Sequence, residues 1–472
     1  MTEAGFDPAR YDIVILGAGS GGYACALRAA ELGKRVALIE KDKVGGTCLH
    51  RGCIPTKALL HAAEVADLAQ DGPGIGVRSR LDGIDMAGVN TYKDKVVTRL
   101  WKGLTGLVAS RKIEVIEGVG RLVSPASVQV GDRVLTGDHV VLATGSDTRT
   151  LPGLEIDGRR VITSEHALQL DHVPSSVVVL GGGVIGVEFA SVWRSFGAEV
   201  TVVEMLPHLL PTEEESSSKL LERAFRRRGI AFKTGMRFES VKDNGDGVTV
   251  LLGDGSTLDA ELMLVAVGRG PVSAQLGYDE VGVEMDRGFV LVDEYCQTNI
   301  PTISAIGDLR PGLQLAHVGF AEGIMVAERL AGLNPPPVDY DGVPRITYSS
   351  PEVASVGITS EMAAARGIEF TDFTYDLAGN GKSQILQTAG SVKVLVEATP
   401  GSGSRDGATG RTLGVHVVGA RAGDLISEAQ LIVNWEATPA DVAQLIHPHP
   451  TQSEAIGEAF LALAGKPLHN HG

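Results

Sequence analysis

The chain carries one pattern of apolar and polar residues twice. An apolar run at residues 11–16 predicts a buried strand that leads into glycines, an Ala-rich helical stretch and a second strand ending at Glu40. The second copy begins with an apolar run at residues 176–180 and ends, after glycines and a helix, at Glu204. In both copies the acid follows the first glycine by 23 residues. This repeat predicts two similar strand–turn–helix–strand units in an α/β fold.

Each glycine run has the spacing Gly-x-Gly-x-x-Gly, with the glycines at Gly17, Gly19 and Gly22 in the first copy and at Gly181, Gly183 and Gly186 in the second. In such a turn the first glycine makes the bend, the second lets backbone approach a pyrophosphate, and the third allows close packing of helix on strand. The phosphate would lie at the helix N-terminus, and Glu40 and Glu204 would accept hydrogen bonds from ribose hydroxyls. Glycines that only form tight turns are the alternative. Two copies in this context favour two bound dinucleotides.

The identities of the two dinucleotides follow from the neighbouring residues. No arginine follows Glu204 until Arg223, so a 2′-phosphate there would meet a carboxylate without a compensating cation, which favours NAD over NADP. The first motif instead leads into Cys48 and Cys53. A dinucleotide that stays beside a redox-active cysteine pair is most simply FAD.

Cys48 and Cys53 are separated by four residues and precede a helical run at 56–68. This spacing can bring the two sulfurs together, and a helix N-terminus would stabilise a thiolate. One sulfur of such a dithiol attacks a disulfide and the other resolves the mixed disulfide. Inert thiols and a zinc half-site are the alternatives, although no second ligand pair lies at metal spacing. Cys25 and Cys296 lack this context, and we expect them to be structural.

Composition and charge narrow the class of protein. The chain has 472 residues, of which 43% are hydrophobic and 21% charged, which predicts a globular protein of several domains. A net charge of −16 disfavours nucleic acid as a partner. No apolar run is long enough to span a membrane, and the first ten residues are polar and do not resemble a signal peptide. We therefore expect a cytosolic protein without a membrane or metal site, in which any disulfide is catalytic.

The stretch Gly45-Gly-Thr-Cys48-Leu-His-Arg-Gly-Cys53-Ile-Pro-Thr-Lys57, which follows a dinucleotide motif, resembles the pyridine nucleotide-disulfide oxidoreductases. The resemblance extends from Tyr11 to about Pro467. It implies two Rossmann-like domains, for FAD and NAD, and a C-terminal α+β dimerisation domain. The details are most similar to members that oxidise dihydrolipoyl groups to lipoyl with NAD as acceptor.

The resemblance also implies roles for single residues. Lys57 resembles a lysine that lies against the flavin and supports its reduced form, and Glu188 resembles a glutamate near the nicotinamide that pairs with Lys57. Further FAD contacts are implied at Gly145, Asp308 and Ala316, and a further NAD contact at Gly268. Arg269, His317 and Glu322 also match the family, but ordinary packing explains them equally well.

The segment from His447 to Glu454 carries a candidate base. A dithiol substrate must lose a proton, and a histidine titrates in the right range. Glu454 follows His449 by five residues, at the start of a predicted helix, and could hold the imidazole in one tautomer. The resemblance implies that His449 is the base and acts on the active site of the other subunit. His447 as a metal ligand is an alternative, and we expect His469 and His471 to be tail residues.

The positions of these motifs predict the domain limits. They are 1–150 for the first part of the FAD domain, 151–275 for the NAD domain, 276–345 for the returning FAD or central part, and 346–472 for the dimerisation domain. Residues 335–337, all proline, form a natural linker before the last domain. The Gly/Ser-rich stretch 399–410 interrupts a predicted hairpin and is expected to be a solvated extension.

The resemblance implies a homodimer whose substrate arrives on the lipoyl-bearing acyltransferase (E2) of a 2-oxoacid dehydrogenase complex, or on the H protein of glycine cleavage. The dihydrolipoyl group would give a proton to His449 and attack Cys48. We expect the positive charge of His50 and Arg51 to favour the thiolate. A reductase of the glutathione, mycothione or mercury type and a redox-silent binding subunit are the competing functions.

Overall fold

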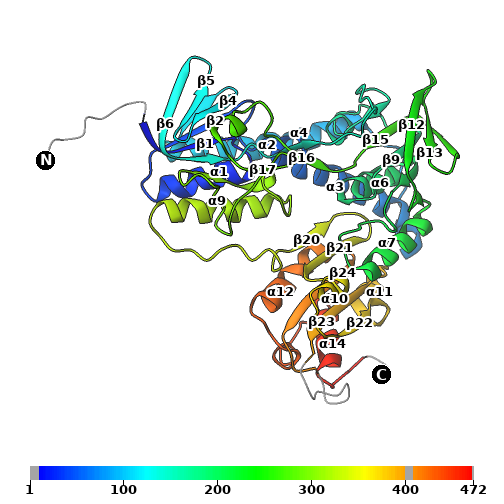
Figure 1. The fold of residues 1–472 in the computed structure, drawn as a ribbon. Coiled ribbons are helices and arrows are strands. Elements are labelled where there is room, and N and C mark those ends of the chain that lie inside the picture. The colour runs from blue at the N-terminus through cyan, green and yellow to red at the C-terminus, as the bar shows by residue number, and fades with distance from the viewer. Residues whose placement is uncertain (1–9, 399–407, 470–472) are drawn as a thin grey trace, which may run out of the picture. The chain divides into compact units, whose positions relative to one another are not determined.

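The computed structural model describes residues 10–398 and 408–469, and its chain forms two compact units. The first unit consists of Met1–Ala58, Ala87–Arg149 and Gly268–Val338, and the second of Leu59–Met86, Thr150–Val267 and Asp339–Gly472. Figure 1 labels the elements of both units. No helix within the described ranges is long and apolar enough to cross a membrane.

Within the described residues, the first unit is built on a seven-stranded sheet with the order β3-β2-β1-β6-β5-β4, in which β19 also pairs with β6. The central strand β1 (Arg10–Leu16) lies parallel to β2 (Val36–Glu40) and β6 (Arg133–Leu142). The parallel part continues with β3 (Glu114–Glu117) and β19 (Ile303–Ala305), and β4 (Gly120–Ser124) and β5 (Ser127–Val130) add an antiparallel edge. Most of the parallel part is buried, which explains its apolar runs.

Two helices of the first unit, α1 (Ser20–Glu31) and α9 (Ala316–Leu330), lie side by side (Figure 1). Glycine permits this close packing, because a Cβ at Gly323 would lie 2.4 Å from Gly21 O. Cys25 and Cys296 are fully buried in the same apolar core, as expected for structural thiols.

The remaining elements of this unit are α2 (Gly46–Arg51), α4 (Met86–Ser110), β7 (Ser146–Thr148), β16 (Arg269–Pro271), α8 (Tyr278–Val281), β17 (Met285–Asp286), β18 (Phe289–Val290) and the 3-10 turn η2 (Gly307–Leu309). Helix α3 (Cys53–Asp71) begins in the first unit and continues into the second.

The second unit repeats the parallel arrangement. In the part of the chain that the structure describes, its sheet has the order β11-β10-β9-β15-β8. The central strand β9 (Ser176–Leu180) lies between β10 (Glu199–Val203) and β15 (Leu262–Val265), as β1 lies between β2 and β6. The predicted internal repeat is therefore present in three dimensions.

The other elements around this sheet are η1 (Gly72–Ile75), β8 (Val161–Ile162), α5 (Ser164–Ala167), α6 (Val184–Phe196), α7 (Glu215–Arg228) and β11 (Ala231–Lys233). A separate antiparallel sheet contains β12 (Phe238–Asp243), β13 (Val248–Leu252) and β14 (Thr257–Ala260).

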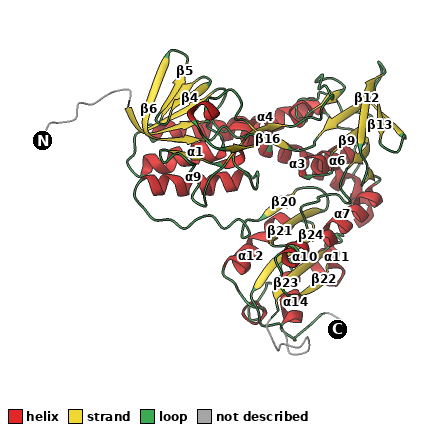
Figure 2. Ribbon diagram, in the orientation of Figure 1, coloured by secondary structure: helices red, strands yellow, loops and turns green. Residues whose placement is uncertain are grey.

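The C-terminal part of the second unit is an antiparallel sheet with the order β20-β21-β24-β23-β22 (Figure 2). Its strands are β20 (Arg345–Thr347), β21 (Glu352–Gly357), β22 (Phe370–Asp376), β23 (Ser391–Glu397) and β24 (Thr412–Gly419), and its short helices are α10 (Ser360–Ala365), η3 (Leu377–Gly379), α11 (Gly381–Ile385) and α13 (Pro439–Val442). Helices α12 (Ala422–Asn434) and α14 (Glu454–Leu463) pack their apolar residues into one core with the sheet. The predicted hairpin of β23 and β24 is confirmed, while 399–407 lie outside the described residues.

A buried polar network connects the start of α7 with the C-terminal sheet. Glu214, which is 2% exposed, accepts hydrogen bonds from Lys393 Nζ at 2.7 Å and from Ser360 N at 2.8 Å. Burial alone would raise the pKa of Glu214, but the contacts with Lys393 and Ser360 outweigh burial and lower it. The charges of Glu214 and Lys393 also act on His416, whose burial lowers its pKa to about 4. The network therefore joins a buried carboxylate to an ammonium group whose side chain is 12% exposed.

Replacing Lys393 should destabilise the second unit strongly. Lys393→Met leaves Glu214 buried without its cation, and we expect a loss of about 3–5 kcal/mol at pH 7, measured as a lower midpoint in urea unfolding. Because the pKa of Glu214 is lowered in the folded chain, this contribution is present above the ordinary pKa of glutamate. It should disappear as the pH falls through the lowered folded value.

Lys219→Met is the matched control, because Lys219 pairs with Glu215 on the exposed surface of the same helix α7. We expect its unfolding midpoint to equal that of the wild type. Equal midpoints for Lys393→Met and the wild type at pH 7 would contradict the importance of the network.

Candidate active site

The first and third glycines of each motif are required by contacts within the turn. Gly17 and Gly181 have φ angles of +104° and +111°, and a Cβ at either would lie 2.3 Å from the carbonyl oxygen of a neighbouring strand end. A Cβ at Gly22 would lie 1.9 Å from Gly17 O, and one at Gly186 would lie 2.0 Å from Gly181 O. A side chain at any of the four positions would force the backbone apart.

The middle glycines have a different environment. Gly19 and Gly183 precede the first turns of α1 and α6, and a Cβ at either would meet nothing within 4 Å. Neither helix start has a side-chain cap, so the backbone N–H groups of its first turn remain available to an anion. This arrangement fits the pyrophosphate of a dinucleotide in both units.

The two acids hold the glycine turns by hydrogen bonds. Glu40 accepts the N–H of Ala18 at 2.9 Å, and Glu204 accepts the N–H of Gly182 at 2.6 Å. The second oxygen of each carboxylate accepts the N–H two residues further along the chain. The sequence predicted contacts of these carboxylates with ribose but not their hydrogen bonds with the backbone of the turn. Because each carboxylate oxygen has two lone pairs, each can still accept a hydrogen bond from a ribose hydroxyl.

The cysteine pair lies where α2 gives way to α3. Cys48 is in α2, Cys53 is the first residue of α3, and both are half-buried free thiols. A hydrogen bond with Cys53 and burial raise the pKa of Cys48, whereas the charge of Lys57 and the hydroxyl of Ser20 act in the opposite direction. The structure thus brings together the two sulfurs and the lysine that the sequence identified.

His50 and Arg51, which we expected to favour the thiolate, have other contacts in the structure. Arg51 pairs with Asp42 at 2.7 Å, and His50 Nε2 lies 3.0 Å from Val44 O. The cation that acts on Cys48 is therefore Lys57.

Sequence reasoning missed Tyr23, which lies on α1 near the two sulfurs. Burial and the charges of Cys48 and Cys53 raise the pKa of Tyr23 to about 12. Its ring packs against Phe320 at a centroid distance of 5.6 Å. Neither its position in the motif nor its spacing from the cysteines pointed to this contact.

Several residues predicted to contact FAD also lie in the first unit. Ser146 donates a hydrogen bond to Asp308 Oδ2 at 2.6 Å and accepts one from Arg269 Nε at 2.8 Å. Gly145, with φ of +71°, precedes this serine, and Ala316 is the first residue of α9. Glu322 is fully buried, pairs with Arg310 and accepts the N–H of Gly307 at 2.6 Å, so these contacts give it a structural role.

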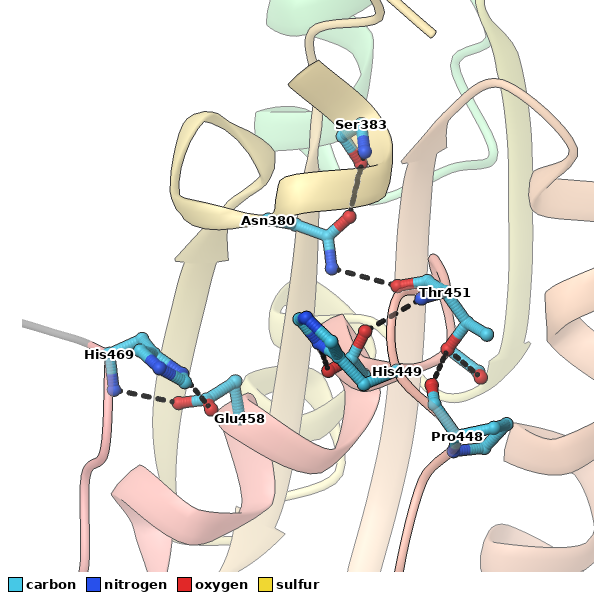
Figure 3. A network of polar contacts seen from close by, with 9 residues as sticks. Asn380, Ser383, Pro448, His449, Thr451, Glu458 and His469 are labelled. Atoms are coloured by element: carbon cyan, nitrogen blue, oxygen red, sulfur yellow. Dashed lines mark hydrogen bonds and ion pairs between the residues drawn. The ribbon is translucent and has the colours of Figure 1, made fainter. Parts of the chain in front are cut away.

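The candidate base His449 lies in the second unit (Figure 3), where it contacts its predicted partner Glu454. His449 Nδ1 lies 2.8 Å from Glu454 Oε1, and the N–H of Thr451 donates to Glu454 Oε2 at 2.6 Å. Burial alone would raise the pKa of Glu454, but Thr451 and His449 outweigh burial and lower it. The His449 side chain is 78% exposed, so its outer ring nitrogen is open to a reactant from outside the unit.

The other C-terminal histidines are also held by carboxylates. His447 Nε2 lies 2.7 Å from Glu428, which raises the pKa of His447, and no metal-binding cluster occurs among the described residues. His469 contacts Glu458 through its backbone N–H and its Nδ1, so it is anchored rather than a loose tail residue (Figure 3). His471 lies outside the described residues.

Glu188 is buried on α6, where its Oε1 accepts the N–H of Tyr348 at 3.0 Å. Its predicted place near the nicotinamide and its predicted pairing with Lys57 stay predictions. Gly268, the first residue of the first unit's last segment, has φ of +105°, and a Cβ there would meet no protein atom within 4 Å. Its predicted contact with NAD stays a prediction.

The chain belongs to the pyridine nucleotide-disulphide oxidoreductase family. Residues 11–323 match the family described as pyridine nucleotide-disulphide oxidoreductase, and residues 343–460 match its dimerisation domain. The predicted family, the fold class and the use of FAD and NAD(H) are therefore confirmed. The match to the dimerisation domain supports the predicted homodimer.

Similar proteins cover almost the whole chain. Dihydrolipoyl dehydrogenase of Bacillus subtilis is 42% identical over 97% of this chain and 99% of its own. The mitochondrial dihydrolipoyl dehydrogenase of Pisum sativum is 39% identical over 97% and 92%. Among solved structures, LpdA from Mycobacterium tuberculosis superposes with a TM-score of 0.86 at 28% identity, covering 96% of this chain and 99% of that one.

The glycine contacts predict different results for two neighbouring substitutions. Gly183→Ala adds a methyl group where no protein atom is near, so the fold should persist while NAD affinity falls by about tenfold or more through obstruction of the pyrophosphate. Gly186→Ala forces a methyl against Gly181 O and should lower the free energy of unfolding by about 1–3 kcal/mol. NADH titration and urea unfolding distinguish the two effects. Unchanged NAD affinity in Gly183→Ala would contradict the assignment of this turn.

Proposed function

We propose that this enzyme oxidises protein-bound dihydrolipoyl groups to lipoyl groups and passes the electron pair to NAD. The observation that carries the proposal is the hydrogen-bonded pair of thiols, Cys48 and Cys53, on which the charge of Lys57 acts, in a chain that also presents an exposed histidine–carboxylate pair. The similarity to dihydrolipoyl dehydrogenases over nearly the full length supports this substrate.

The thiol chemistry starts from the disulfide between Cys48 and Cys53. His449 takes a proton from one dihydrolipoyl thiol, and the resulting thiolate attacks Cys48. The Cys48–Cys53 bond breaks, Cys53 leaves as a thiolate, and Cys48 is held in a mixed disulfide. The second dihydrolipoyl thiol then attacks the first dihydrolipoyl sulfur and breaks its bond to Cys48, and its proton passes to the departing Cys48 sulfur. The substrate leaves as a disulfide, and the enzyme holds Cys48 as a thiol, Cys53 as a thiolate and the first proton on His449.

Bound FAD supplies the electron transfer from this dithiol to NAD. The glycine turn and Glu40 in the first unit are placed to hold the FAD pyrophosphate and ribose, and Asp308 adds a further polar contact. The corresponding turn with Glu204 holds NAD. Glu204 is 8% exposed, and a 2′-phosphate beside this carboxylate would be repelled, which favours NAD over NADP.

The exposure of His449 supports action on the partner subunit. A base used within its own unit would gain from a protected position, whereas 78% of this side chain is open to a second molecule. Glu454 accepts the imidazole hydrogen at Nδ1 and leaves Nε2 free to accept the substrate proton. Each homodimer would then contain two active sites, with cysteines and base from different chains.

The partners that fit this chemistry carry a lipoyl group on a mobile arm. We propose the acyltransferase (E2) of a 2-oxoacid dehydrogenase complex, with the H protein of glycine cleavage as a second candidate. We place the enzyme in the cytosol, where a reducing environment keeps structural thiols such as Cys25 and Cys296 reduced.

Steady-state oxidation of dihydrolipoamide tests the proposal. We expect fast reduction of NAD, reduction of NADP slower by about 100-fold or more in kcat/KM, and a loss of about 1000-fold or more in Cys48→Ser. Cys25→Ala is the matched control, because Cys25 is buried and takes no part in exchange, so its turnover should equal that of the wild type.

Two results would contradict the proposal in different ways. Reduction of glutathione or mycothione disulfide without dihydrolipoamide turnover would keep the cysteine chemistry but overturn the substrate. Normal dihydrolipoamide turnover in Cys48→Ser would overturn the exchange mechanism itself.

A further inference from the structure

The side chain of Asn380 contacts the loop that carries the candidate base (Figure 3). Asn380 is 4% exposed and is the N-cap residue of α11. Its Nδ2 donates to Thr451 O over 2.9 Å, although 71 residues separate the two in the chain. No motif in the sequence analysis included this asparagine.

The hydrogen bonds of Asn380 fix it in one orientation. Its Oδ1 accepts the backbone N–H of Ser383 at 2.8 Å and the Ser383 hydroxyl at 2.9 Å. Its backbone N–H donates to Leu377 O, and its backbone carbonyl accepts the N–H of Gln384. Because only the nitrogen of the amide can donate, these contacts require that Nδ2 face Thr451.

Thr451 connects Asn380 with the histidine–carboxylate pair. Asn380 holds the Thr451 carbonyl, while the Thr451 N–H donates to Glu454 Oε2 and its hydroxyl donates to Pro448 O. The other oxygen of Glu454 contacts His449 Nδ1. A continuous series of hydrogen bonds therefore runs from the N-cap of α11 to the imidazole.

The exposure of His449 makes this series important. A ring that is 78% exposed has little packing to fix its orientation, so its direction depends on Glu454. Glu454 can orient the ring only while the Thr451 backbone keeps the carboxylate in place. Of the side chains in this series, the buried Asn380 is the one that comes from a different segment of the chain.

We infer that Asn380 is a positioning residue for the base His449, acting through the backbone of Thr451 and the carboxylate of Glu454. The inference rests on the proposed function, because it requires that His449 take the substrate proton. It assigns to α11 a role in dihydrolipoyl oxidation beyond its place in the fold.

The test uses Asn380→Ser in the dimeric holoenzyme. A serine retains an N-cap acceptor for Ser383 but is too short to reach Thr451 O. We expect turnover of dihydrolipoamide to fall about tenfold at pH 7, in line with the loss of a group that orients a reacting side chain. The deficit should shrink to about twofold near pH 9.5, because a thiol substrate then ionises without a base.

Three comparisons make the result specific. NADH-dependent reduction of ferricyanide does not require a base for a thiol and should be unchanged in Asn380→Ser. Thr359→Ala removes a comparable N-cap, that of α10, where Thr359 accepts the N–H of Met362, and should leave dihydrolipoamide turnover unchanged. Asn380→Asp retains the size and the cap acceptor and should repeat the pH 7 deficit if Asn380→Ser does not fold.

The outcomes separate this inference from the proposed function. Unimpaired dihydrolipoamide turnover in His449→Ala would contradict the base assignment and overturn this inference, while the proposed reaction itself would stand. A slow His449→Ala beside a normal Asn380 variant at pH 7 would overturn the positioning role alone. A deficit that is equal at both pH values, or that extends to ferricyanide reduction, would also overturn it, because general structural damage would explain such a result.

Discussion

Backbone-to-backbone contact at two glycine turns is the constraint on which this structure depends. At Gly17 and Gly181 the turn lies so close to a neighbouring strand end that a side chain has no room, and Gly22 and Gly186 close the same turn from the helix side. The carboxylates of Glu40 and Glu204 then hold the turns by accepting backbone N–H groups. These contacts leave the starts of α1 and α6 without a side-chain cap, so the tight packing and the open helix starts have one cause.

The cysteine pair and the histidine–carboxylate pair are each formed by residues that are close in the sequence, at helix ends of the two units. In the first unit, the end of α2 and the start of α3 bring Cys48 and Cys53 together, with Lys57 one turn further along α3. In the second unit, the start of α14 places Glu454 against His449, where a carboxylate is also favoured by the helix N-terminus. The buried pair of Lys393 and Glu214 connects α7 with the C-terminal sheet in that unit.

The sequence could predict the features whose residues are close along the chain. The glycine motifs, the cysteine pair and the pair of His449 and Glu454 depend on short spacings, and all three appear in the structure. Contacts between distant segments have no such signal, which is why Asn380, Ser146 and Tyr23 were missed. Arg51, which we expected to favour the thiolate, pairs with Asp42.

We propose that thiol exchange uses the cysteines of one subunit and the base of the other. A mixed dimer of Cys48→Ser and His449→Ala chains, purified with two different tags, tests it directly, since each parent homodimer should be nearly inactive. We expect the mixed dimer to recover about half of the wild-type turnover of dihydrolipoamide, because one of its two sites combines an intact Cys48 with an intact His449. A mixed dimer as inactive as its parents would show that the base serves its own chain and would contradict a site shared between subunits.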